Sequence, residues 1–323
     1  MATNINARLI LGAGLLGIST LAFAVVSGSL TYLLLPSYPN TYATTPLALN
    51  QSGTIVGYYQ PVGGAVHGYK EDGLSFTTVE PPGSLGSSVE GINDHGDMVG
   101  VYCPTLKGCP GETGQYGFSY KNGTYHKLAY PLPKVATIAN AINNLGQVVG
   151  GYCPGPVACA PGGGIQPSAH AFSLSRSVYT TVDFPGALGT EAQGVNDAGD
   201  IVGYYEELSG RVHGYLYSAG VFSTIDPPGA TYTLARGINN AGTITGGFID
   251  AGGHGHAFTF QYGAYTTVDV PHSTSSSGNG INNAGAFVLQ AVVNVSGPAS
   301  SFEATPTASS TADPSAEAAE SQR

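Results

Sequence analysis

Four histidines recur at matched places along the chain, and a carboxylic acid follows each of them after 13 residues. The pairs are His67 and Glu80, His170 and Asp183, His213 and Asp226, and His256 and Asp269. A histidine bonded to a carboxylate is a frequent general-base arrangement in hydrolytic enzymes. Four copies nevertheless favour a buried structural hydrogen bond, because an active site needs only one pair. We therefore predict structural pairs and no catalytic residue.

The sequence around each pair predicts that its two members meet. The midpoint between His213 and Asp226 falls at the turn signal Ala219-Gly220, and residues equidistant from a hairpin turn face each other. The second repeat has Tyr116 in place of the histidine, and we align Tyr130 with the acid. Both partners change together there, as expected for groups that bond each other.

The four cysteines lie in two matching segments, CPTLKGC (Cys103 and Cys109) and CPGPVAC (Cys153 and Cys159). Four cysteines in an exported chain allow three disulfide pairings. Equal spacing favours the two local pairs, and bridges between the two segments are the second alternative. A four-cysteine zinc site fits less well, because its usual spacings are tighter and an exported chain meets oxidising conditions.

These residues belong to a sequence that repeats six times. An apolar residue, Asn, two variable residues and Gly recur at Asn50, Asn93, Asn143, Asn196, Asn239 and Asn282, in steps of 43, 50, 53, 43 and 43 residues. Each motif precedes an apolar segment such as TIVGYY, then HGY or HAF, then a closing segment such as YTTVDFPG. Gly-bearing turns separate these β-branched and aromatic runs and a proline ends the last, which predicts four short strands per unit.

Four strands in a unit of 43 residues is the size of a β-propeller blade. The residue two before each Asn is always small, as expected where innermost strands converge: Ala48, Gly91, Ala141, Gly194, Gly237 and Gly280. We predict an all-β fold, a six-bladed β-propeller of four-stranded blades. Its units lie near residues 41–83, 86–132, 137–186, 191–229, 234–272 and 277–304 plus 30–36.

An N-terminal strand is predicted to close the ring. The segment LTYLLLP, which ends at Pro36, resembles the closing segments YTTVDFP and YTTVDVP, although its proline lies 14 residues before an Asn rather than 11. The sixth unit has no fourth strand of its own before the C-terminal segment. We therefore expect residues 30–35 to pair with the C-terminal strands and complete that blade.

Two sets of residues that break the repeat are candidates for ligand binding. The position three before each Asn is mostly polar, and we expect it to line a central channel with Glu90, Asn140, Gln193, Arg236 and Asn279. Loops between second and third strands share one face of a propeller. There we expect an exposed binding surface made of Tyr58, Tyr204, Glu206, Glu207 and Arg211.

Metal-binding patterns are weak in this sequence. NDHGD and NDAGD, which begin at Asn93 and Asn196, resemble parts of a calcium loop, but other repeats lack these acids at the same turn. HGH at residues 254–256 could ligate a metal, but His256 is already the repeat histidine of its unit. The sequence contains no phosphate-binding loop, nucleophile elbow or metalloprotease motif. We predict no metal and no cofactor.

The segments HAFTF, HAFSLS, INNAGTITGG and VNDAGDIVGYY resemble the HAF family of probable extracellular repeats. That family has a His-Ala-Phe strand and an Ile-Asn-x-x-Gly-x-Val-Val-Gly strand pair. The resemblance covers residues 47–290, with HGY in two units, YGF in the second and no histidine in the last. It implies an exported repeat protein, and it implies no reaction.

Charge and the two ends of the chain bear on location and partners. The net charge is −10 with only 10 basic residues, which argues against nucleic acid. Arg8, the apolar run from Leu9 and Ala22-Phe23-Ala24 form a secretory signal layout over residues 1–24, although the uncharged run is also long enough for an uncleaved membrane anchor. Residues 305–323 lack aromatics and predict a disordered tail after a propeller over 25–304.

We therefore predict a secreted, periplasmic or cell-surface monomer that meets a membrane only if its leader is retained. Its predicted role is non-catalytic binding of a glycan, a peptide or a surface protein. A propeller-based hydrolase or lyase acting on a glycan or lactone is the alternative, and it needs acids that converge outside the repeat. A purely structural surface or adhesion protein is the third, and it predicts no concave polar pocket.

Overall fold

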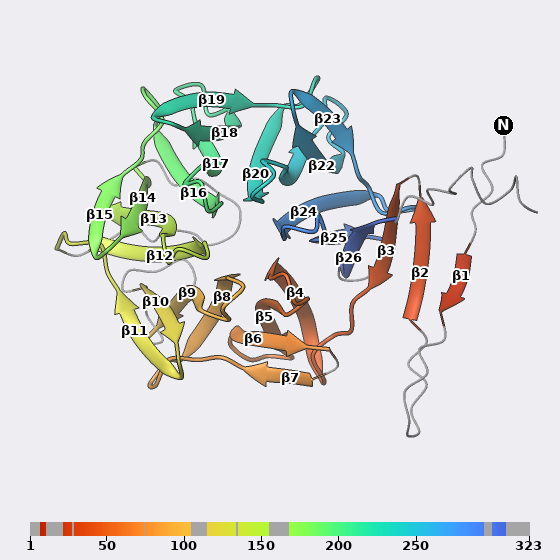
Figure 1. The fold of residues 1–323 in the computed structure, drawn as a ribbon, viewed down its shortest axis with the longest axis horizontal. Coiled ribbons are helices and arrows are strands. Elements are labelled where there is room, and N and C mark those ends of the chain that lie inside the picture. Colours follow the sequence, from red (N-terminus) through yellow and green to blue (C-terminus); the bar gives the residue numbers. More distant parts are fainter. Residues whose placement is uncertain are drawn as a thin grey trace, which may run out of the picture.

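A computed structural model describes residues 7–10, 22–27, 29–73, 75–104, 115–133, 135–154, 168–293 and 299–307. Every regular element assigned in these segments is a β-strand. Six antiparallel sheets stand around a central axis, and each sheet has one edge strand nearest the centre (Figure 1). The predicted all-β, six-bladed β-propeller is confirmed.

Five blades are built from four consecutive strands each. Blade 1 contains β4 (Thr41–Leu49), β5 (Ile55–Pro61), β6 (His67–Asp72) and β7 (Ser75–Thr78); blade 2 contains β8 (Gly86–Ile92), β9 (Met98–Cys103), β10 (Tyr116–Lys121) and β11 (Thr124–Leu128). Blade 3 contains β12 (Val135–Ile142), β13 (Val148–Pro154), β14 (His170–Ser175) and β15 (Val178–Thr181); blade 4 contains β16 (Gly189–Val195), β17 (Ile201–Glu206), β18 (Val212–Ser218) and β19 (Val221–Ile225). Blade 5 contains β20 (Tyr232–Ile238), β21 (Ile244–Ile249), β22 (Gly255–Gln261) and β23 (Ala264–Thr267).

The sixth blade joins the two ends of the chain, as predicted. It contains β24 (Ser275–Ile281), β25 (Phe287–Val292), β26 (Ser300–Pro306) and, as its fourth strand, β3 (Leu30–Leu34). β3 runs antiparallel to β26, with Leu34 opposite Phe302 and Tyr32 opposite Ala304. Two more strands, β1 (Ala7–Ile10) and β2 (Ala22–Ser27), extend this sheet outward from β3 (Figure 1).

The C-terminal boundary of the propeller lies beyond the predicted residue 304. β26 continues to Pro306, and the Thr307 N–H donates to the Ser29 carbonyl at 2.8 Å. The first residues of the expected tail therefore belong to the sixth blade. The rest of that tail, 308–323, lies outside the described residues.

The proline that ends the closing segment is Pro39, and the predicted Pro36 is wrong. The Tyr38 N–H donates to a threonine hydroxyl at 2.9 Å, just as the Phe184 N–H does at 3.0 Å in blade 4. Tyr38-Pro39 thus takes the place of Phe184-Pro185. Pro39 lies 11 residues before Asn50, so the spacing is the ordinary one.

Removal of residues 1–24 as a leader stays a prediction. Within the described segments, no helix has the length and hydrophobicity that a membrane crossing requires.

The hydrophobic core is divided among the junctions between blades. Val56 of blade 1, for example, packs with Val89, Met98 and Phe118 of blade 2, and each is at most 3% exposed. Alternation along each strand sends one face to each neighbour, so both faces of a blade are covered.

Glycine in the second strand is required by a bulge in the first. A Cβ on Gly57 would lie 1.9 Å from the Thr45 carbonyl oxygen, and four equivalent glycines meet the same obstacle at 1.9–2.1 Å: Gly100, Gly150, Gly203 and Gly246. Blade 6 has Leu289 there, and its first strand skips two residues between Gly278 and Ile281.

The small residues two before each Asn also have a steric cause. A Cβ on Gly280 would lie 2.7 Å from Ala48 Cα of blade 1. The expected crowding of the innermost strands is therefore present.

Candidate functional site

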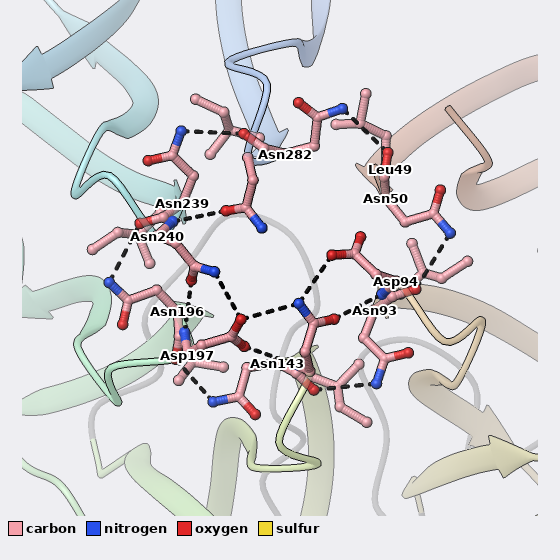
Figure 2. Close-up of a pocket in the computed structure, with 17 residues that line it drawn as sticks. Leu49, Asn50, Asn93, Asp94, Asn143, Asn196, Asp197, Asn239, Asn240 and Asn282 are labelled. Atoms are coloured by element: carbon pink, nitrogen blue, oxygen red, sulfur yellow. Dashed lines mark hydrogen bonds between the residues drawn. The ribbon is translucent and has the colours of Figure 1, made fainter. Parts of the chain in front are cut away.

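The six repeat asparagines close a ring of hydrogen bonds at one end of the channel (Figure 2). Within its own turn, Asn143 Oδ1 accepts the N–H groups of Leu145 and Gln147 at 3.1 and 2.9 Å. Its Nδ2 donates to the Asn196 carbonyl of the next blade at 2.8 Å. The six links, at 2.8–3.3 Å, run through Asn50, Asn93, Asn143, Asn196, Asn239, Asn282 and back to Asn50. Asparagine carries both the acceptor for its turn and the donor for its neighbour.

Acids and amides next to this ring bind one another. Asn144 Nδ2 donates to Asp94 Oδ2 at 2.9 Å and to Asp197 Oδ2 at 3.0 Å, while Asn240 Nδ2 donates to Asp197 Oδ2 at 2.7 Å. The cavity here measures about 70 Å³, well below the range of about 300–1,000 Å³ typical of small-ligand pockets. This end of the channel is therefore a structural closure.

Four of the five predicted channel residues line one cavity of about 80 Å³ halfway along the axis. They are Glu90, Asn140, Gln193 and Arg236. Asn279 is instead 4% exposed, accepts a hydrogen bond from Arg236 Nη1 at 3.2 Å and donates to the Pro46 carbonyl at 2.9 Å. Asn279 thus holds Arg236 and joins blade 6 to blade 1.

Glu191 is a buried carboxylate that was not among the predicted site residues. It is 4% exposed and accepts hydrogen bonds from Tyr204 at 2.8 Å, Asn140 at 3.1 Å and Gln193 at 3.1 Å. Burial raises the pKa of Glu191, and these bonds and the Arg236 charge oppose that rise. Tyr204 is 1% exposed, so its predicted place on an exposed surface is wrong.

The channel widens at its other end into a cavity of about 360 Å³, which we call the mouth cavity. Its volume falls within the range of about 300–1,000 Å³ of small-ligand pockets. Its polar lining includes Tyr58, Gln60, Ser88, Glu90, Gln115, Arg236 and Gln290, and its apolar lining includes Leu47, Val66 and Val101. The predicted binding residue Tyr58 is half-buried at its wall.

Glu90 and Arg236 set the electrostatics of the mouth cavity. Burial raises the pKa of Glu90 to about 7; the Ser88 hydroxyl and Arg236 oppose this rise, and the Glu191 charge adds to it. Arg236 Nε is buried and has no hydrogen-bond partner among the described residues. An unpaired buried donor costs about 1–3 kcal/mol.

All four predicted His–acid pairs are hydrogen-bonded through Nδ1. The distances are 2.6 Å for His67–Glu80, 2.6 Å for His170–Asp183, 2.5 Å for His213–Asp226 and 2.6 Å for His256–Asp269. The histidine side chains are 11–36% exposed, so the expected burial holds for His213 and is only partial for the other three. Each pair joins the first or second residue of a third strand to the residue one or two positions beyond the end of a fourth strand, on a different blade each time.

The register corrects one alignment in blade 2. Tyr130 stacks on a tyrosine of the next blade at 3.6 Å between ring centroids, and so does Phe184, the residue after Asp183. Ala129, rather than Tyr130, therefore takes the acid's place. The histidine and the acid are still absent together, because Tyr116 and Ala129 replace them.

The other predicted binding residues lie on blade 4, and none of them lines the mouth cavity. Glu206 ends β17, and Glu207 Oε2 lies 3.7 Å from His213 Nε2. Arg211 Nη2 donates to the Ala230 carbonyl at 2.6 Å. The expected surface is therefore divided between the cavity, the interior and a separate loop.

Cys103 and Cys153 end the equivalent strands β9 and β13 or lie next to their ends, and both are 2% exposed. Cys109 and Cys159 lie outside the described residues. The local pairing stays a prediction.

No protein-family model and no curated protein matches this chain. Among solved structures, AofleA from Arthrobotrys oligospora is similar over 82% of this chain and 84% of its own, with 12% identity and a TM-score of 0.50. A fucose-specific lectin from Aleuria aurantia aligns over 85% of this chain and 100% of its own, with 12% identity and a TM-score of 0.43. A Trypanosoma rangeli sialidase aligns over 94% of this chain and 60% of its own, with 9% identity and a TM-score of 0.46. The likeness to AofleA agrees with the β-propeller fold, and the fold is all that identities this low show.

Proposed function

We propose that this protein is a non-catalytic β-propeller that binds a carbohydrate unit in its mouth cavity. The observation that carries the proposal is the lining of that cavity, where the Tyr58 ring stands with the amides of Gln60 and Gln290 and the charged pair Glu90 and Arg236. Sugar hydroxyls both donate and accept hydrogen bonds, and the apolar face of a sugar ring packs against aromatic side chains.

The charges of the cavity favour a neutral ligand with many hydroxyls. Glu90 accepts hydrogen bonds when ionised, whereas Arg236 only donates them. Because Glu90 and Arg236 carry opposite charges, a carboxylate or an ammonium ligand would be attracted by one of them and repelled by the other. A hydroxylated ligand can pair with both.

A glycan-acting hydrolase or lyase is the second candidate, and one observation favours it. The pKa of Glu90 is raised to about 7, as a general acid at neutral pH requires. Most glycoside hydrolases need a second carboxyl group across the scissile bond. Glu90 is the only carboxylic acid among the described residues that line the cavity, and Glu191 is bonded to three side chains. Binding without turnover therefore fits better.

A glycan array followed by calorimetric titration tests the proposal. The wild-type protein should bind a saccharide, and Tyr58→Ala should weaken that binding at least tenfold. Tyr42→Ala is the matched control, because Tyr42 is 64% exposed and does not line the cavity. Equal binding by Tyr58→Ala, or binding only to a peptide or surface protein, would refute the carbohydrate site. Turnover of an aryl glycoside or a lactone that Glu90→Gln abolishes would establish the enzyme instead.

We further propose that the chain is exported and belongs to the HAF family of extracellular repeats. The leader layout, the four cysteines and the ordered repeat motifs support this proposal. Cell fractionation and N-terminal sequencing should find an exported chain that begins at Val25. A cytosolic chain with its N-terminus intact would contradict it.

A further inference from the structure

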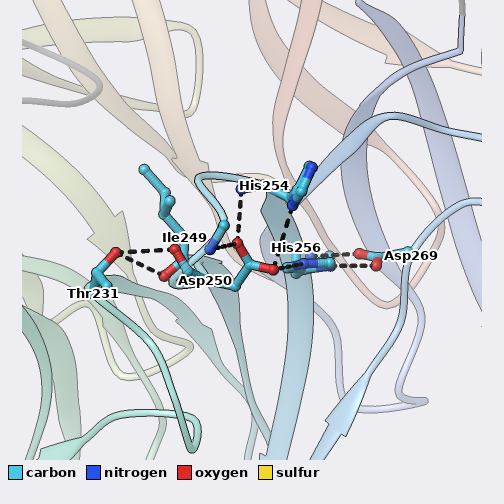
Figure 3. A network of polar contacts seen from close by, with 8 residues as sticks. Thr231, Ile249, Asp250, His254, His256 and Asp269 are labelled. Carbon is cyan, nitrogen blue, oxygen red and sulfur yellow. Dashed lines mark hydrogen bonds and ion pairs between the residues drawn. The ribbon is translucent and has the colours of Figure 1, made fainter.

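The loop between β21 and β22 brings two imidazoles to one carboxylate (Figure 3). Asp250 Oδ2 lies 3.5 Å from His254 Nδ1 and 3.4 Å from His256 Nε2. These separations exceed those of good hydrogen bonds. The proposed carbohydrate site does not use these three residues.

Backbone donors orient the Asp250 carboxylate. Its Oδ1 accepts the N–H groups of Gly252 and His254, both at 2.8 Å. Oδ2 is thereby directed at both rings. Because the loop already holds Oδ2 in this orientation, binding of a ligand to it costs little further conformational entropy.

A second carboxylate fixes the His256 ring from behind. His256 Nδ1 lies 2.6 Å from Asp269 Oδ2, and Asp269 Oδ1 accepts the Ala257 N–H at 2.9 Å. This arrangement leaves Nε2 directed toward Asp250. Histidines that ligate metals commonly bond a carboxylate through their other nitrogen, which sets the tautomer and strengthens the ligand.

We propose that Asp250, His254 and His256 bind one divalent transition-metal ion of the zinc type, with Asp269 positioning His256. Metal–ligand bonds of about 2.0–2.2 Å at tetrahedral angles place neighbouring ligand atoms about 3.3–3.6 Å apart. The two distances at Asp250 Oδ2 match that spacing. Two imidazoles and one carboxylate suit zinc, with water as the fourth ligand.

The site closes on binding. In the described part of the chain, no three such side chains already converge on one metal-sized position. The His254 side chain is 67% exposed, so its ring can turn toward the ion without displacing packed neighbours.

Blade 4 supplies an internal comparison. Glu207, Arg211 and His213 stand in the same register, and the Glu207 N–H donates to the Arg211 carbonyl at 3.0 Å, as the Asp250 N–H does to the His254 carbonyl. Arginine has no acceptor and cannot ligate a metal. The two loops therefore share one backbone turn, but the position that holds the ligand His254 in blade 5 holds Arg211 in blade 4.

Calorimetric titration of the full chain, prepared without a histidine tag, with Zn²⁺ tests the proposal. The wild type should bind one ion per chain. His254→Arg, which copies blade 4, should weaken binding more than tenfold, and Asp269→Asn should weaken it about 10–100-fold. His272→Gln is the control, because His272 is exposed and lies outside the loop. Thermal unfolding without metal checks that each variant is folded.

Visible absorption of the Co²⁺-substituted chain identifies the ligands. An intense tetrahedral spectrum without a sulfur-to-cobalt band, absent in His254→Arg, is the expected result. Failure of the wild type to bind Zn²⁺, wild-type affinity in His254→Arg, or a sulfur-to-cobalt band would overturn the proposal. The metal site and the carbohydrate site share no residue, so saccharide binding in these variants tests only the carbohydrate site.

Discussion

The N-terminal strand β3 should hold the propeller closed, and truncation tests this prediction. β3 supplies the outer partner of β26 along five residue pairs. Its Tyr32 is 3% exposed and packs in one cluster with Val268 and Val270 of blade 5 and Phe287 of blade 6. Removal of residues 1–27 eliminates β1 and β2 but keeps β3, whereas removal of residues 1–35 also eliminates β3.

The magnitude follows from the burial of Tyr32. Truncating a buried aromatic side chain to alanine costs about 3–5 kcal/mol, so Tyr32→Ala should lower the free energy of unfolding by that amount. Each kcal/mol shifts the melting temperature by about 2–4 °C in a domain of roughly this size, which gives a fall of roughly 6–20 °C. Removal of residues 1–35 should cost at least as much, because it also exposes the edge of β26.

Urea denaturation measures the loss in free energy of unfolding caused by Tyr32→Ala and by the removal of residues 1–35. Far-ultraviolet circular dichroism follows the unfolding, since the chain has no tryptophan. Tyr42→Ala is the control: Tyr42 is 64% exposed, and its removal should change the free energy of unfolding by no more than about 0.5 kcal/mol. Removal of residues 1–27 should leave the midpoint nearly unchanged. If the chains that begin at residues 28 and 36 unfolded at the same midpoint, β3 would not hold the propeller closed.

Three other results are expected. Asn239→Asp keeps the acceptor of its turn but loses the Nδ2 donor to the Asn282 carbonyl, and the loss should cost about 1–3 kcal/mol in urea denaturation; an unchanged midpoint would show that the asparagine ring is dispensable. The pKa of Glu90 is raised from 4.5 to about 7 in the folded protein, so the folded state binds more protons than the unfolded state between these values, and stability falls as pH rises through that window. Glu71 has a similarly raised pKa, so the wild type is compared with Glu90→Gln. The variant should match the stability of the wild type near pH 4 and exceed it near pH 8 by up to about 3 kcal/mol. If the stability of both proteins changed with pH at the same slope, Glu90 would not be the group responsible. Peptide mapping of the non-reduced protein should find two local disulfides, whereas four free thiols would count against export. The expected bridges are Cys103–Cys109 and Cys153–Cys159.

Much of the fold could be predicted because its determinants are local and repeated. Turn residues, strand lengths and the place of each His–acid pair depend on neighbours within one unit, and the repeat displays them several times over. The closing strand could also be inferred, since a blade with only three strands needs a fourth. The exact register of Pro39 could not be predicted, because an extra residue shifts the segment. Only the hydrogen bond from the Tyr38 N–H to the Thr44 hydroxyl fixes it.

The candidate site was harder to predict, because its residues come from different blades. Local sequence accounts for the bonds of the repeat asparagine within its own turn, but its bond to the next blade involves a residue 43–53 positions away. The mouth cavity likewise joins Tyr58 of blade 1 and Glu90 of blade 2 to Arg236 of blade 5. The one local signal is the third position before the Asn, which is polar in five of the six repeats.

The sequence by itself determined the number of blades, their strands and the chemistry repeated within each blade. Only the tertiary structure decided which of the irregular residues face open space. Tyr58 and Tyr204 occupy the same place in their strands, but Tyr58 lies opposite Thr45 and Tyr204 opposite Glu191. Glu191 accepts a hydrogen bond from the Tyr204 hydroxyl and holds that ring in the interior, whereas Tyr58 remains at the cavity wall. The difference lies in a partner across the blade, and the repeat pattern of either strand alone does not contain it.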